Sequence, residues 1–279
     1  MTICGVIFAA GEGTRLRPLT ETVPKPLCPI GNVALLDRAL ARLKQHRLSG
    51  PALVAVNACY LADRVADHVG GRAYVSREPG PQALGTSGAL GHLKDWIAGR
   101  AVLAGNADAY LAPRTDTGHD LAALLDDWDE QTVRVLCVPA VGRPAEFGKN
   151  RFAGFSLIPA DLVTALPPER DELVHTLWRP AERAGRLEVV MYDGDYLDTG
   201  TPADFLAANL DAAGGGSLVA PDAVVSGPVS RSVVGAGARV EGSLTRSVVF
   251  PGGVVGPGED LVDAIRLGSD VTVSGAGPR

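Results

Sequence analysis

The chain has 279 residues, with 26 Lys and Arg against 32 Asp and Glu, so its formal net charge is −6. With 46% hydrophobic and 21% charged residues, its composition is that of a soluble globular protein and excludes a disordered chain. The acidic balance argues against a nucleic-acid partner, which would need a basic face. No apolar run approaches the roughly 18 residues that span a bilayer, and the N-terminus lacks the basic segment of a signal peptide. We therefore expect a cytoplasmic protein with no membrane partner.

Up to about residue 213, apolar runs typical of buried strands alternate with stretches that carry apolar residues at helical spacing. The predicted strands are residues 3–10, 52–56, 101–104 and 133–138, and the predicted helices are residues 34–47, 87–96 and 120–128. This alternation predicts an α/β fold with a mostly parallel, Rossmann-like sheet flanked by helices. In such sheets ligands bind beyond the carboxyl ends of the strands, so the residues that follow each strand are candidates for function.

The most specific segment, AAGEGTRLRPLTETVPKPLCPI at residues 9–30, begins where the first predicted strand ends. Gly11 and Gly13 lack side chains, so backbone N–H groups can approach phosphate oxygens there. Arg15 adds a fork of donors for the same anion, and Lys25 stands between two prolines that stiffen its loop. The segment therefore predicts a phosphate-binding loop.

Two common phosphate-binding loops are excluded here, because Leu16 stands where a dinucleotide fingerprint needs glycine and the Gly-Lys-Ser/Thr of a P-loop is absent. The segment instead resembles the signature of sugar-1-phosphate nucleotidyltransferases, G-x-G-T-R-[LM]-x-P-L-T followed by P-K-P-L-x-P-I. The resemblance implies that Arg15 contacts the outgoing pyrophosphate and that Lys25 bridges the reacting phosphates, which makes both catalytic. It assigns nucleotide binding to Ala9, Gly11, Gly13, Thr14 and Arg15.

Two aspartates stand in further segments that resemble family motifs. Asp108 ends the apolar run VLAGNAD, like the family's N-[GA]-D, and Asp198 lies in YLDTGTP, like its D-x-G-T-P. The resemblance implies that both hold Mg²⁺ and that Asp108 is catalytic. Two carboxylates suit Mg²⁺, which fills its remaining positions with water and phosphate oxygens. As a bare pattern, Asp198 could instead shape the turn before the next helix.

The segment LGTSG at residues 84–88 resembles the family's L-G-T-[AG]-G. The resemblance implies that Gly85 and Thr86 contact the nucleotide base or ribose. As a bare pattern, the segment starts a helix with Thr86 or Ser87 as its N-cap. Glu78 fits the acid that commonly precedes this segment, and the pattern gives it no role.

The sugar-phosphate side departs from the family, because the E-K-P motif whose lysine binds the sugar phosphate is absent. Lys149 is the expected substitute, and Arg143 and Arg151 are alternatives. The stretch FAGF resembles the family's N-x-G-x-[YF] strand, so the resemblance also implies substrate binding at Gly154.

From residue 214 onward glycine becomes frequent, with 14 of the 34 glycines, and a 15-residue unit repeats three times. Val219, Val234 and Val249 recur at this period, each followed by another valine six residues later. Such spacing is typical of a hexapeptide solenoid. Since three hexapeptides make an 18-residue coil, one side of each coil should be shortened. Leu267 and Val273 predict a fourth, shifted copy.

The repeats predict two domains, a nucleotidyltransferase catalytic domain at residues 1–213 and a short left-handed β-helix at residues 217–279. No histidine follows His175, which disfavours the acyltransferase activity known for other hexapeptide proteins. We expect the tail to be structural, to pack on the catalytic domain or a second subunit, and to help form a homo-oligomer. The four cysteines are too scattered for a CxxC site or a disulfide framework, so we expect reduced, mostly buried thiols.

These features together predict an Mg²⁺-dependent enzyme. It would transfer a nucleotidyl group from an NTP, with GTP favoured, to a sugar 1-phosphate such as mannose 1-phosphate, and release pyrophosphate. The L-G-T-x-G form with a hexapeptide tail looks most like mannose-1-phosphate guanylyltransferases. A uridylyl or other nucleotidyltransferase acting on a different sugar 1-phosphate is the alternative. A non-catalytic, ligand-sensing homologue is an alternative of another class.

Overall fold

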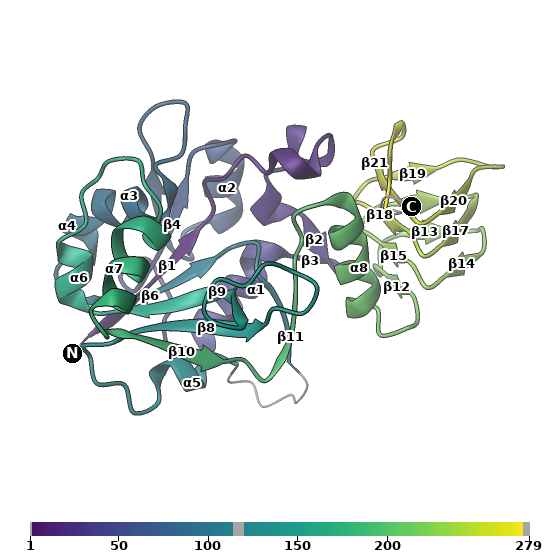
Figure 1. Cartoon of the computed structure of the whole chain (residues 1–279). Coiled ribbons are helices and arrows are strands. Elements are labelled where there is room, and N and C mark those ends of the chain that lie inside the picture. Colours follow the sequence, from purple (N-terminus) through teal and green to yellow (C-terminus); the bar gives the residue numbers. More distant parts are fainter. Residues whose placement is uncertain (1, 114–119, 276–279) are drawn as a thin grey trace. The chain divides into compact units, whose positions relative to one another are not determined.

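The computed structural model describes residues 2–113 and 120–275 (Figure 1). The chain forms two compact units, of which unit 1 is Met1–Glu12 with Leu36–Tyr196, and unit 2 is Gly13–Leu35 with Leu197–Arg279. The sequence-based division into residues 1–213 and 217–279 stays a prediction. The two compact units differ from this division, because the loop segment 13–35 and the last helix belong to the same unit as the tail.

Unit 1 is built on a seven-stranded sheet with the order β10-β8-β9-β6-β1-β4-β5 (Figure 1). Its strands are β1 Ile3–Phe8, β4 Val54–Ala58, β5 Tyr74–Arg77, β6 Ala101–Asn106, β8 Val133–Pro139, β9 Asn150–Ile158 and β10 Leu187–Met191. Only β9 runs antiparallel to its neighbours in this sheet, which confirms the mostly parallel fold. The edge strands β5 and β10 are partly exposed and so lack the continuous apolar run that revealed the others. A second, two-stranded sheet pairs β7 Tyr110–Pro113 with β11 Gly194–Leu197.

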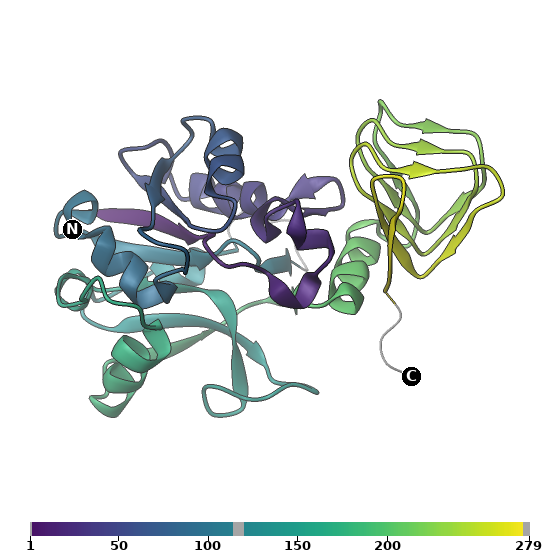
Figure 2. The ribbon, with the colours of Figure 1, turned by 90° about the horizontal axis from the view of Figure 1, so that it is seen from above.

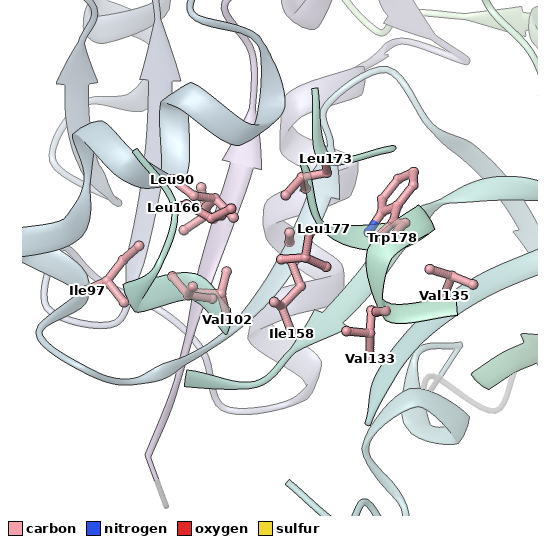
Figure 3. Close-up of a cluster of buried hydrophobic side chains, with 14 of the residues drawn as sticks. Leu90, Ile97, Val102, Val133, Val135, Ile158, Leu166, Leu173, Leu177 and Trp178 are labelled. Carbon is pink, nitrogen blue, oxygen red and sulfur yellow. The ribbon is translucent and has the colours of Figure 1, made fainter. Parts of the chain in front are cut away.

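Helices cover both faces of the large sheet. On one face, α3 Gly85–His92, α4 Lys94–Ile97, α6 Ala160–Thr164, the π-helical turn η4 Val174–Trp178 and α7 Arg179–Arg183 share an apolar cluster with β1, β6 and β8 (Figure 3). On the other face lies α1 Leu35–Gln45, where Leu43 approaches so closely that a Cβ at Gly5 would lie 2.6 Å from its Cδ1. Within the described residues this unit also contains the helices α2 Ala62–Val69 and α5 Ala122–Leu125.

Two of the predicted helices differ in extent from the observed ones. The predicted helix 87–96 is divided into α3 and α4 at Leu93, whose backbone leaves the helical region. The predicted helix 120–128 is only α5, because Asp126 is extended and Asp127 has a φ of 50°. The spacing of apolar residues predicts neither break, because both are changes in backbone conformation.

The tail in unit 2 forms a β-helix with three parallel faces (Figure 2). The faces consist of β12 Leu218–Val219, β15 Val233–Val234, β18 Val248–Val249 and β21 Ala264–Leu267; β13 Val224–Val225, β16 Arg239–Val240 and β19 Val254–Val255; and β14 Val229–Ser230, β17 Ser243–Thr245 and β20 Asp260–Val262. The register pairs Val219 with Val234 and Val234 with Val249, which confirms the predicted period. The strands of the first coil start at 218, 224 and 229 and the next coil starts at 233, so the steps are six, five and four residues. The shortening is therefore shared by two sides, and the prediction of one shortened side was wrong.

A column of serines occupies the tightest corner of the coils. The Ser232 N–H donates to Ser217 Oγ at 3.2 Å, and the Ser247 N–H donates to Ser232 Oγ at 3.0 Å. The residues just before Ser232 and Ser247, Arg231 and Arg246, have φ values of 45° and 46°. Each serine thus supplies an acceptor to a backbone donor that the sharp corner leaves without a sheet partner.

The predicted fourth copy is only half correct. Leu267 ends β21, which continues the first face, but Val273 lies in β22 Val271–Ser274, which runs antiparallel to β21. A turn at Gly268, whose φ is 63°, reverses the chain. The hairpin covers the last strand edge of this face, whereas at the other end the first-coil residue Val219 stays 45% exposed.

The tail packs on the rest of unit 2, which also contains α8 Pro202–Ala212 and a hairpin of β2 Pro29–Ile30 and β3 Val33–Ala34. The rings of Phe205 in α8 and Phe250 in the β-helix are 5.7 Å apart. The fully buried Asn209 of α8 accepts a hydrogen bond from Gly31 N at 2.9 Å, and Asn32 Nδ2 donates to the Val234 carbonyl at 3.0 Å. Packing within the chain therefore covers one side of the tail, and the homo-oligomer stays a prediction.

The four cysteines are free thiols, as predicted. Burial raises the pKa of Cys4 to about 11 and that of Cys28 and Cys137 to about 12. No helix within residues 2–113 and 120–275 combines the length and hydropathy needed to cross a bilayer.

Candidate active site

The carboxyl ends of the central strands bring the first group of candidate residues to one edge of the sheet. β1 lies between β4 and β6, with Phe8 level with Asn57 on one side and with Asn106 on the other. Ala9 therefore leaves the sheet beside Asn57, and Asp108 leaves it two residues beyond Asn106. Asp108 is half-buried. This is the edge at which the parallel fold predicts a ligand.

A buried polar network at this edge was not foreseen from the sequence. Asn57 Oδ1 accepts a hydrogen bond from Ala9 N at 2.6 Å, and Asn57 Nδ2 donates to Glu78 Oε1 at 2.7 Å. The other carboxylate oxygen, Oε2, accepts from Leu84 N at 2.8 Å. The network joins the start of the phosphate-binding loop to the residue before Gly85. The acid before the LGTSG segment was the only sequence signal for it.

Burial and the negative charge of Glu78 both affect the pKa of the neighbouring Cys59 thiol. The thiol is partly exposed and donates to the Gly80 carbonyl at 3.7 Å. Burial raises the pKa of the Cys59 thiol, and the negative charges of Glu78 and Glu12 raise the pKa further. Cys59 is therefore protonated at neutral pH and is a weak nucleophile.

Thr86 is engaged differently from the cap predicted for it. Helix α3 starts without a side-chain cap, so the prediction that Thr86 or Ser87 caps it was wrong. Instead, the Thr86 hydroxyl donates to Glu172 Oε2 at 2.6 Å and accepts from Leu173 N at 2.9 Å, and Thr86 N also donates to Glu172 Oε2 at 3.0 Å. Thr86 thereby fastens α3 to the chain before η4. Contact of Gly85 and Thr86 with a nucleotide stays a prediction.

Three glycines let this same chain segment lie directly on α3. Gly85, Gly88 and Gly91 are three residues apart and so share one face of the helix. A Cβ at each would lie 2.4, 2.4 and 2.1 Å, respectively, from backbone carbonyl oxygens of the segment 167–171. Gly85 also has a φ of 74°. The LGTSG segment is thus a backbone-to-backbone packing surface as well as a candidate nucleotide site.

The candidates for the sugar-phosphate side lie on and before β9. A Cβ at Gly154, whose φ is 90°, would lie 2.3 Å from Ala109 Cβ, so this strand passes against the residue after Asp108. Because β9 is antiparallel to β6, its first residues extend past the carboxyl end of β6, and Lys149 lies exposed just before them. Arg151 donates to the Tyr196 carbonyl at 3.0 Å and stacks on the Tyr196 ring. Binding of the sugar phosphate by Lys149, with Arg143 and Arg151 as alternatives, stays a prediction.

In unit 2, the rest of the phosphate-binding loop folds on itself through three short turns, η1 Thr14–Leu16, η2 Leu19–Glu21 and η3 Lys25–Leu27. Gly13 has a φ of 63°, and a Cβ there would lie 3.0 Å from both Lys25 Cβ and Thr20 Cγ2. Thr20 Oγ1 donates to the Gly13 carbonyl at 2.9 Å. Lys25 is only 7% exposed. The glycine thus allows the lysine stem to pack against the loop backbone, while Thr14 stays exposed.

Arg15 and Asp198 meet at Gly200. A Cβ at Gly200 would lie 2.8 Å from Arg15 Nη2 and 3.0 Å from Asp198 Oδ1, and Gly200 N donates to Asp198 Oδ1 at 2.9 Å. The following Thr201 accepts from Asp204 N at 3.2 Å and so caps α8. The structure therefore brings together two predicted residues that are 183 positions apart in the sequence (198 − 15). It also shows why this motif contains glycine, a function that sequence analysis had not given Gly200.

The chain is similar to known nucleotidyltransferases. The sequence profile of the family described as Nucleotidyl transferase matches residues 4–149. A mannose-1-phosphate guanylyltransferase from Mycobacterium tuberculosis is 28% identical over 97% of this chain and 79% of its own length. An N-acetylmuramate alpha-1-phosphate uridylyltransferase from Neisseria meningitidis is 35% identical over 37% of this chain and 46% of its own. A Bacillus anthracis structure named as a glucose-1-phosphate thymidylyltransferase shares the fold, with a TM-score of 0.61, 18% identity, and coverage of 76% of this chain and 95% of that one.

Proposed function

Because the chain belongs to the nucleotidyl transferase family, we propose that it transfers a nucleotidyl group from an NTP to a sugar 1-phosphate and releases pyrophosphate. The observation that carries the proposal is the arrangement of Arg15 against Gly200 beside Asp198, with Lys25 packed on the same loop. GTP and a mannose-like sugar are favoured, since the similarity to the guanylyltransferase extends over nearly the whole chain. UTP is the alternative, on the similarity to the uridylyltransferase.

The proposed reaction is an in-line attack of the sugar phosphate on the α-phosphorus. The second pKa of a phosphate is near 6, so the attacking group is largely dianionic at neutral pH and needs little help from a base. The obstacle is repulsion between two anions, which at 4 Å is about 4 kcal/mol per pair of unit charges at an effective dielectric constant of 20. Arg15, Lys25 and the loop amides offset this repulsion. Lys25 is well suited to it, because its buried stem holds the ammonium group in place.

We propose Mg²⁺ as the cofactor, with Asp108 and Asp198 each supplying a carboxylate. The donors fit, because Mg²⁺ is usually held by one or two protein carboxylates and by substrate phosphates. Both side chains are half-buried, and the Gly200 N–H orients that of Asp198. When bound, the metal would neutralise phosphate charge. Across residues 2–113 and 120–275, no group of three or more His, Cys, Asp or Glu is arranged around a metal site, so the proposal rests on these two carboxylates.

A panel of NTPs against several sugar 1-phosphates, read out as released pyrophosphate, tests the proposed reaction and its specificity. Asp108→Asn and Asp198→Asn should each lower turnover by orders of magnitude without unfolding the protein, and EDTA should abolish activity. The exposed Asp193→Asn is the matched control and should leave turnover unchanged. Near-normal turnover in both site variants would refute the metal assignment. Nucleotide binding without turnover by any substrate pair would favour a ligand-sensing homologue instead.

The two cations are separable by kinetics. Arg15→Ala should weaken NTP and pyrophosphate binding. Lys25→Ala should chiefly lower kcat, because its interaction strengthens in the transition state. A Lys25→Ala enzyme with normal kcat and only a raised KM for NTP would contradict the function given to Lys25.

A further inference from the structure

Glu78 carries a buried carboxylate that the proposed reaction does not use. It lies between two segments for which nucleotide binding is predicted. Glu78 is 8% exposed and Asn57 3% exposed, and both belong to unit 1. Glu78 Oε1 accepts from Asn57 Nδ2 at 2.7 Å and Oε2 accepts from Leu84 N at 2.8 Å. Glu78 N also donates to the Ala58 carbonyl at 2.9 Å. The carboxylate is thus held by the backbone and by donors on two other segments.

The network has a fixed hydrogen-bond direction. Ala9 N and Leu84 N are backbone donors at its two ends, so each can only be matched by an acceptor. Asn57 turns its oxygen to Ala9 and its amide N–H to Glu78, which leaves Glu78 accepting at both oxygens. Burying a charge is costly unless it is hydrogen-bonded, and here each oxygen of the carboxylate accepts one hydrogen bond. At a buried position where no hydrogen bonds have to be made, an apolar side chain would stabilise the fold more than a carboxylate does.

The two ends of the network are the two chain segments assigned to the nucleotide. Ala9 begins the phosphate-binding loop, and Leu84 precedes Gly85 and Thr86. We propose that Glu78 and Asn57 are positioning residues that set the distance between these two segments, and with it the affinity for the NTP. This inference rests on the proposed nucleotidyl transfer. Neither side chain is assigned contact with substrate, so both act through the backbone that they hold.

The direction of the hydrogen bonds makes the proposal testable by exchange. Glu78→Gln brings an N–H₂ group into a place where both neighbours are donors, so one of Asn57 Nδ2 and Leu84 N loses its acceptor. Asn57→Asp keeps the acceptor for Ala9 N but turns a second carboxylate oxygen toward Glu78. The double variant Asn57→Asp with Glu78→Gln restores all three hydrogen bonds, with the middle one reversed, and keeps the net charge of the pair.

The experiment measures NTP dissociation constants and the separate KM values for NTP and sugar 1-phosphate. Each single variant should weaken NTP binding by on the order of tenfold or more, the effect of one unmatched buried donor or acceptor. The KM for sugar 1-phosphate should change by less than about threefold, since those contacts lie elsewhere. The double variant should bind NTP within about threefold of wild type. Glu188→Gln, at a half-exposed glutamate paired with Arg134, is the matched control and should bind like wild type.

The outcomes separate the two proposals. A wild-type protein that binds no NTP overturns the proposed function and this inference with it. If wild type binds NTP, single variants with normal affinity overturn the inference alone, as does a double variant no better than the single ones. A general loss of stability without a selective change in NTP affinity also overturns it. If a single variant fails to fold, the double variant still decides, because the proposal requires it to fold and to bind NTP.

Discussion

The substitution Gly91→Ala tests the contact between α3 and the segment 167–171. A glycine-to-alanine change inside a helix normally stabilises it by about 1 kcal/mol. Here the new Cβ would lie 2.1 Å from the Pro167 carbonyl oxygen and 2.4 Å from its carbonyl carbon. Non-bonded carbon and oxygen atoms prefer roughly 3.5 Å, so the backbone of residue 167 must retreat by more than an ångström. The contact therefore opposes the helical preference.

The size of the effect follows from these two opposing contributions. Overpacking a core costs about 1–3 kcal/mol, and an overlap with rigid backbone belongs at the upper end. Subtracting the helix gain leaves a net loss of about 2 kcal/mol, or a fall in Tm of about 4–8 °C for a unit of this size. Urea and thermal unfolding followed by circular dichroism measure it. Gly11→Ala is the control, because within the described residues no atom beyond Gly11 and its two chain neighbours lies within 4 Å of its Cβ position. A Gly91→Ala protein as stable as wild type, or more stable, would refute the packing argument.

Four further predictions concern the surroundings of the site and the tail. Thr86→Val should lower the unfolding free energy by about 1–2 kcal/mol in urea titrations, because two polar partners lose their hydrogen bonds, whereas Thr86→Ser should keep most of it. At neutral pH, a thiol reagent followed by mass spectrometry should modify Cys59 alone in the folded protein, and slowly; labelling of the buried cysteines at a similar rate would contradict their burial. Phe205→Ala should lower the free energy of unfolding by about 3–5 kcal/mol, because it removes the ring that packs on Phe250. Truncation after Gly216 should lower the Tm and the size of the oligomer in solution, yet leave pyrophosphate release measurable. A truncated protein that keeps the oligomeric state of wild type would argue against an oligomer formed by the tail.

The sequence by itself determined the features that repeat or that chemistry restricts to few residues. Buried parallel strands are continuous apolar runs, so β1, β4, β6 and β8 were recognisable. The 15-residue period predicted the register of the first coils of the β-helix, since each coil needs the same inward residue, but in the last coil Val248 pairs with Ile265, 17 residues on. The glycines and cations of residues 9–30 pointed to phosphate, because few other ligands need bare backbone beside Arg15 and Lys25.

The tertiary structure decided what depends on partners far apart in the chain. The sequence pattern gives Glu78 no function, whereas in the structure its oxygens accept hydrogen bonds from Asn57 and Leu84. The bare local pattern predicts a helix cap at Thr86, whereas its hydroxyl donates to Glu172, which lies 86 residues away. The position of Arg15 against Gly200 likewise has no trace in local pattern. Local patterns record which face of an element is apolar and which backbone shapes a residue tolerates. They do not record which distant donor completes a buried acceptor, and that completion is what gives these polar side chains one position.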